Sequence, residues 1–170
     1  MKPFEMTEAF HRVFDSEGSK QPTAFPAEKG RNRVSFKIEE LVEFLYATSE
    51  GDRAVFEESL EAMHQAIEKA KNKIKSKNHL VKDPLVEQVD ALTDLLYFTY
   101  GSFSLMGVDP EPIMKIVHQA NMGKLFPDGQ PHYDPVTKKV LKPTNWERDF
   151  SPEAKIRVEL DRQINKKAEI

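Results

Sequence analysis

The sequence has 170 residues, of which 39% are hydrophobic and 31% charged, a composition typical of a folded globular protein and not of a disordered chain. The formal net charge of −3 does not favour nucleic-acid binding through bulk positive charge. The absence of cysteine excludes disulfides, thiolate metal sites and a cysteine nucleophile. No stretch approaches the roughly 20 consecutive apolar residues of a membrane span, and the N-terminus lacks a secretory signal, so we expect a cytoplasmic protein without membrane contact.

Apolar residues recur at helical spacing over most of the sequence, which predicts an all-α protein. In chain order we expect a loop at 20–31, a small β-hairpin or extended arm at 132–143, and helices at 4–14, 33–49, 52–76, 84–107, 110–126 and 151–166. The helix at 84–107 is apolar on nearly every side, so we expect it to be central.

These elements predict a helical bundle of four to five main helices with a small C-terminal extended arm or hairpin. We expect one domain made of an N-terminal helix and loop (1–30), a helical core (31–125) and a C-terminal arm and helix (126–170). The narrow apolar stripe of the third main helix and the apolar surface of the fourth favour further packing, in a homodimer or a dimer of dimers.

Two of the predicted helices carry acidic residues at helical spacing among apolar neighbours. Glu40 and Glu43 lie about 60° apart on one of these helices. Glu87, Asp90 and Asp94 follow the spacing i, i+3, i+7 on the other, with leucine and aromatic residues around them. Carboxylates gathered on an apolar helix lose hydration and repel one another, and a divalent cation removes both penalties.

The chemistry of these ligands predicts a hard cation. Oxygen donors without cysteine and without an evident histidine pair favour Mg²⁺ or Mn²⁺ over zinc. Because Mg²⁺ keeps several waters and is usually completed by substrate phosphates, the acidic residues indicate a phosphoanhydride substrate. The alternative interpretation is that the acids are ordinary surface charge, which is the usual explanation for an ExxE pair taken alone.

Two segments, EELVEF at 39–44 and VDALTDLLYFTYG at 89–101, resemble the all-α nucleoside triphosphate pyrophosphohydrolases. This superfamily includes the MazG-type enzymes, the dimeric dUTPases and phosphoribosyl-ATP pyrophosphohydrolase. The segment VHQANMGKL at 117–125, followed by DGQ and by KKVLKP at 138–143, is similar to the phosphoribosyl-ATP pyrophosphohydrolase-like branch. The resemblance covers about residues 30–145.

This resemblance implies an enzyme that hydrolyses a nucleoside triphosphate, or a related phosphoanhydride, to a monophosphate and pyrophosphate. It implies metal binding by carboxylates on two helices, namely Glu40, Glu43, Asp90 and Asp94. It also implies that a carboxylate not fully used for ligation orients or deprotonates the attacking water, with Glu39 and Glu40 as the candidates.

One position departs from the family pattern. Ala91 stands where many members have a glutamate, three residues before Asp94. Asp90 is the natural substitute because the i, i+4 spacing keeps it on the same helix face as Asp94. Glu87 is the other candidate for this second acid, although its place near the helix N-terminus also suits an ordinary structural role.

Cations and amides near the C-terminus are candidate substrate ligands. Asn121 and Lys124 share a helix face, and Lys139 and Lys142 lie in the predicted arm, where they would close over phosphates or remain solvated lysines. A non-catalytic helical interaction module that keeps the bundle is the alternative function, and the departure at Ala91 is the feature that favours it.

Overall fold

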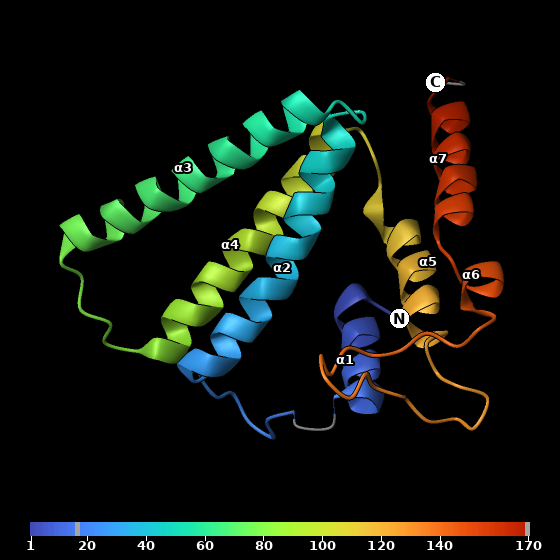
Figure 1. Cartoon of the computed structure of the whole chain (residues 1–170), viewed down its shortest axis with the longest axis horizontal. Helices are drawn as coiled ribbons and strands as arrows, with labels where there is room; N and C mark the ends of the chain where they lie inside the picture. The colour runs from blue at the N-terminus through green and yellow to red at the C-terminus, as the bar shows by residue number, and fades with distance from the viewer. Residues whose placement is uncertain (16–17, 169–170) are drawn as a thin grey trace. The chain divides into compact units, whose positions relative to one another are not determined.

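The computed structural model describes residues 1–15 and 18–168, and within these ranges it contains helices and loops but no strand (Figure 1). The helices are α1 (Pro3–Phe14), α2 (Ala27–Thr48), α3 (Arg53–Lys77), α4 (Pro84–Leu105), α5 (Pro110–Met122), α6 (Trp146–Asp149) and α7 (Glu153–Ala168). The predicted all-α class is therefore confirmed. None of the described helices is both long enough and apolar enough to cross a membrane.

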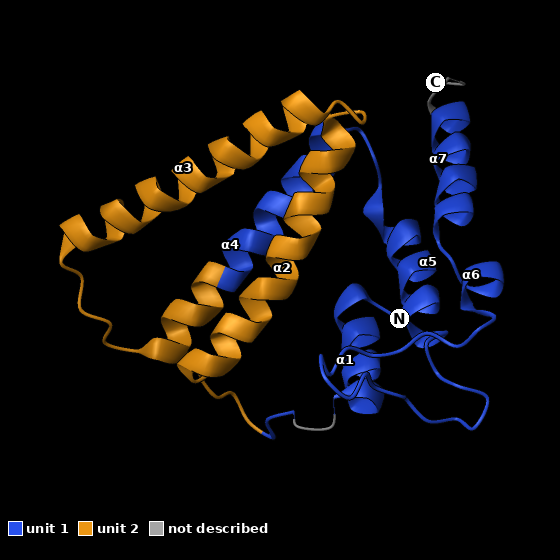
Figure 2. Ribbon diagram, viewed as in Figure 1, with its two compact units in different colours: residues 1–20, 92–170 blue, residues 21–91 orange. Residues whose placement is uncertain are grey.

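The chain divides into two compact units (Figure 2). Unit 1 comprises residues 1–20 and 92–170, and unit 2 comprises residues 21–91. Helix α4 belongs to both, since its first turns lie in unit 2 and the rest lies in unit 1. The single domain expected from the sequence stays a prediction.

Unit 2 is built on the packing of α2 against α3. The rings of Tyr46 and Phe56 meet edge to face at 5.2 Å between centroids, one contact between the two helices. Asp52 begins α3 as an N-cap, because its side chain accepts backbone N–H groups of the first turn at 2.8 and 3.1 Å. The segment before α2 is tied to α4 by two hydrogen bonds between the Phe25 backbone and the Gln88 side chain, at 2.8 and 3.1 Å.

Unit 1 is organised around α5, which contacts both α1 and α7. The buried hydrophobic residues of the described chain all lie in this unit: Met6, Phe14, Ala120 and Trp146. The buried Gln163 of α7 forms two hydrogen bonds with the backbone of Asp109, at 2.8 and 3.0 Å. Because a buried amide needs partners for both its donor and its acceptor, this pair fixes α7 at the start of α5.

The C-terminal arm between α5 and α6 is extended, with a single antiparallel bridge between Tyr133 and Val140. The Tyr133 hydroxyl donates to the Phe14 backbone carbonyl at 2.8 Å, and the Trp146 indole N–H donates to the Ala120 carbonyl at 2.8 Å. These bonds attach the arm and α6 to α1 and α5.

Three sequence expectations were wrong in detail. Helix α2 begins at Ala27 instead of residue 33, because Pro26 provides an extended N-cap and the following Ala-Glu-Lys favours helix. Helix α5 ends at Met122 instead of continuing to residue 126. The short helix α6 was not expected.

The expectation that α4 is central was also wrong, because this helix is not buried within one copy of the chain. Residues 89–100 of this helix are all exposed, including Tyr97 at 77% and Phe98 at 70% of their maximal accessible surface. The apolar surface that suggested a buried helix is therefore left largely uncovered within one copy of the chain.

Candidate active site

The first group of candidate ligands lies in the second half of α2. Glu39, Glu40 and Glu43 are all exposed, whereas Val42 and Leu45 of the same helix are half-buried. Glu40 and Glu43 form no hydrogen bond or ion pair with any residue that the structure describes. Their three-residue spacing places both carboxylates on one helix face, as the sequence predicts.

The second group lies on α4, where Asp90 and Asp94 are one helical turn apart and both exposed. Neither carboxylate has a hydrogen-bond or ion-pair partner in the described part of the chain. Glu87 differs, because its carboxylate lies 3.1 Å from His79 Nε2 through each oxygen and accepts the Lys82 backbone N–H at 3.3 Å. Glu87 therefore holds the loop before α4, which favours Asp90 over Glu87 as the second acid of this helix.

The chemistry of the two pairs fits a hard divalent cation. Four carboxylates without protein partners supply only oxygen ligands, the type that Mg²⁺ and Mn²⁺ prefer. No cluster of three or more histidine, cysteine or acidic residues arranged to hold a metal occurs among residues 1–15 and 18–168. The two pairs are each formed within a helix, and a complete metal site from both pairs stays a prediction.

The C-terminal candidates are engaged in contacts within unit 1. The Lys124 ammonium donates to Asn121 Oδ1 at 2.8 Å across the end of α5. The Lys142 ammonium lies 3.7 Å from the centroid of the Trp146 ring and 3.3 Å from Glu147 Oε1, so it helps to attach the arm to α6. Lys139 is exposed in the arm, and its backbone carbonyl accepts the Asp134 N–H at 2.9 Å.

Lys37 of α2 was not among the candidates chosen from the sequence. Its side chain is half-buried and donates to the Arg33 backbone carbonyl at 3.1 Å. Burial lowers the pKa of Lys37 below its ordinary value, and the nearby Arg33 charge lowers it further. Its position three residues before Glu40 is the feature of the sequence that would have identified Lys37 as a candidate.

An apolar pocket of about 330 Å³ lies within unit 1, between α1, the second half of α4, and α5. Its lining includes Phe4, Tyr100, Phe103 and Met114, with Glu111 as its charged member. None of the acidic candidates lines this pocket. Because phosphates need cations or N–H donors, the pocket is chemically unsuited to a polyphosphate.

Comparison with solved structures identifies the class of protein. The chain is similar to a crystal structure of a "putative NTP pyrophosphohydrolase" from Exiguobacterium sp. 255-15, with 38% identity, a TM-score of 0.86 and 97% coverage of both chains. The fold is thus that of the all-α nucleoside triphosphate pyrophosphohydrolases.

The family follows from a second comparison. The model of the phosphoribosyl-ATP pyrophosphohydrolase family matches residues 7–121. The chain belongs to this family, and it is a hydrolase that acts on phosphoanhydride bonds. Pyrophosphohydrolases of this family typically need a divalent metal ion. No curated protein matches the chain.

Proposed function

We propose that this protein is a Mg²⁺-dependent nucleoside triphosphate pyrophosphohydrolase that releases a nucleoside monophosphate and pyrophosphate. Family membership supports the reaction class. The observation on which the proposal mainly rests is the presence of two carboxylate pairs, on α2 and α4, that have no partner among the described residues.

The proposed metal ligands are Glu40 and Glu43 of α2 together with Asp90 and Asp94 of α4. When bound, Mg²⁺, or Mn²⁺ in its place, neutralises charge on phosphate oxygens and lowers the pKa of a coordinated water. Glu39 and Glu40 are the proposed residues that orient or deprotonate the attacking water.

Substrate contacts are proposed for four residues of the C-terminal half, which are Asn121, Lys124, Lys139 and Lys142. The ammonium groups would donate charge-assisted hydrogen bonds to phosphate oxygens. Since Lys142 already contacts Trp146 and Glu147, its use on the substrate requires exchange of those contacts.

We also propose that the functional protein is a homodimer or a dimer of dimers. The apolar side chains of α4 are exposed in one copy of the chain, with Leu96 at 56%, Tyr97 at 77% and Phe98 at 70% of their maximal accessible surface. Because apolar side chains gathered in this way are typical of a protein interface, a second copy is the expected cover.

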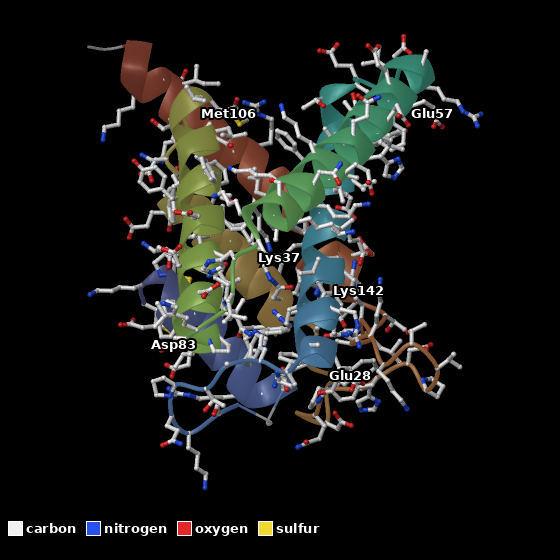
Figure 3. All side chains as sticks on the ribbon, turned by 90° about the vertical axis from the view of Figure 1, so that its left-hand side faces the viewer. Glu28, Lys37, Glu57, Asp83, Met106 and Lys142 are labelled. Atoms are coloured by element: carbon white, nitrogen blue, oxygen red, sulfur yellow. The ribbon has the colours of Figure 1, made fainter. Side chains whose placement is uncertain are left out.

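The test is pyrophosphate release measured over a panel of nucleoside triphosphates and phosphoribosyl-ATP, with and without Mg²⁺. Glu40→Gln and Asp94→Asn should each lower turnover by about 100-fold or more, because each removes one charged metal ligand. Glu57→Gln is the matched control, an exposed glutamate of α3 without a partner among the described residues (Figure 3).

Glu87→Gln separates the two candidates for the second acid of α4. If Glu87 acts only by holding the loop through His79, Glu87→Gln should leave turnover within about twofold of wild type. Its cost should be confined to stability, to which an exposed ion pair contributes about 1 kcal/mol or less. Equal turnover in wild type, Glu40→Gln and Asp94→Asn would contradict the proposed site. No turnover in wild type together with no Mg²⁺ binding by calorimetry would favour the non-catalytic interaction module.

A further inference from the structure

Helix α2 carries a row of cations before its acidic residues. Lys29, Arg33 and Lys37 follow the spacing i, i+4, i+8, and Glu40 comes three residues after Lys37. At 100° per residue, all four side chains leave the helix within about 80° of arc. The cations therefore share a face of α2 with the first of the proposed metal ligands.

These cations are half-buried, and none of the three forms an ion pair with an acid among residues 1–15 and 18–168. Lys29 and Arg33 instead lie over the rings of Phe25 and Phe36, at 5.4 and 5.5 Å from the ring centroids. The Lys37 ammonium donates to the Arg33 carbonyl at 3.1 Å.

Two physical costs follow from this arrangement. Like charges four residues apart on a helix repel one another, and loss of hydration disfavours a charged amine. Both act on Lys37, whose pKa is lowered by burial first and by the Arg33 charge second. An anion bound between Arg33 and Lys37 would remove both costs.

We propose that Lys37, together with Arg33, binds the phosphate groups of the substrate, beside the metal ligands of the same helix. The proposal rests on the proposed function, which supplies a polyphosphate substrate. Three residues correspond to a rise of about 4.5 Å along a helix, so a phosphate bound at Lys37 lies about one helical turn from Glu40. The planar guanidinium of Arg33 donates two parallel N–H groups to another pair of phosphate oxygens.

This assignment differs from Lys142 in one respect. The Lys142 ammonium is paired with the Glu147 carboxylate within unit 1. Lys37 and Arg33 contact a backbone carbonyl and an aromatic ring, and among the described residues neither has a carboxylate to release before it binds an anion.

The experiment uses inorganic tripolyphosphate as the probe, because it carries the phosphates without any choice of base. Binding to the full chain is measured by calorimetry in the presence of Mg²⁺, at low and at high ionic strength. The variants are Lys37→Gln and Arg33→Gln, with Lys69→Gln on α3 as the matched control, since Lys69 is exposed and far along the chain from the acids. Lys37→Arg tests whether charge alone restores binding.

We expect Lys37→Gln and Arg33→Gln each to weaken binding by about tenfold or more, the loss of one charge-assisted hydrogen bond to phosphate. Binding should depend less on ionic strength in both, whereas Lys69→Gln should match wild type and Lys37→Arg should recover most of the affinity. Circular dichroism and light scattering establish that fold and oligomeric state are unchanged.

Two results would overturn the proposal. If Lys37→Gln and Lys69→Gln bind tripolyphosphate equally while wild type still hydrolyses nucleotides, the proposed function stands and the cation row is not its phosphate site. If Lys37→Gln changes the oligomeric state but leaves the affinity for tripolyphosphate unchanged, the cations of α2 pair with a carboxylate of a second copy and not with phosphate. Wild type that neither binds the probe nor hydrolyses any nucleotide would refute both proposals.

Discussion

Substituting Gly123 by alanine tests how the C-terminal segment packs on α5. Gly123 is the C-cap of α5 and has right-handed backbone angles of φ −65° and ψ −5°. Alanine adopts these angles without strain, so the backbone alone would give a gain of about 0.4–1 kcal/mol. A Cβ added at this position, however, would lie 2.9 Å from Phe150 Cβ and closer still to Cγ and Cδ1 of that ring.

The clash decides the sign of the effect. Because the Phe150 Cβ is attached to its backbone, rotation of the ring cannot clear the contact, and the segment after α6 has to shift. Overpacking of this kind costs about 1–3 kcal/mol, which leaves a net loss of about 1.3 kcal/mol at the middle of the two ranges. For a chain of this length the melting temperature should fall by about 3–5 °C.

The assay follows Trp146, the only tryptophan in the chain, whose indole N–H donates to Ala120 three residues before Gly123. Its fluorescence reports unfolding of the region that contains the clash. A double-mutant cycle with Phe150→Gly isolates the contact, since glycine removes the Cβ together with the ring and alanine at 123 should then be neutral or stabilising. Stability of Gly123→Ala equal to that of wild type, or an equal loss with and without the Phe150 side chain, would contradict the clash.

Two further predictions concern assembly and acid stability. Phe98→Glu on α4 should convert the proposed homodimer to a monomer by light scattering, whereas Val136→Glu, on an exposed residue of the arm, should leave it intact; a dimer that persists in Phe98→Glu as it does in Val136→Glu would contradict the role of α4. Hydrogen bonds from Arg162 and then Gln163 lower the pKa of Glu159 from 4.5 to about 2, so its stabilisation is complete above pH 4.5 and is lost as pH falls to about 2. The free energy of unfolding, measured across this pH range, should fall less in Arg162→Gln than in wild type. An equal fall in both proteins would contradict a contribution from the Arg162–Glu159 pair.

The helix boundaries that were predictable are those set by local chemistry. Helices α3, α4 and α5 begin within one residue of the expected positions 52, 84 and 110. The aspartate before each helix, Asp52, Asp83 or Asp109, accepts a backbone N–H of the first turn. The start of α2 was less predictable, because Gly30 resembles a loop residue. In the structure its N–H donates to the Pro26 carbonyl at 3.0 Å, inside the first turn of the helix.

Side-chain roles were predictable only where one helix contains the whole interaction. The spacing of Glu40 with Glu43 and of Asp90 with Asp94 follows from helical geometry alone. The role of Glu87 depends on His79, eight residues earlier and across a loop, which no periodicity predicts. The half-burial of Lys37 is likewise not given by the pattern of residues on α2.

The incorrect position of α4 links the fold to the proposed site. An all-round apolar helix predicts burial, but it does not predict which surface covers the helix. Within one chain Asp90 and Asp94 are exposed, so the loss of hydration that would make a cation necessary does not arise there. It would arise once a second copy covers the leucine and aromatic side chains around these acids. Assembly and metal binding should therefore be coupled, with Mg²⁺ favouring the dimer and Asp94→Asn making dimer formation less dependent on Mg²⁺.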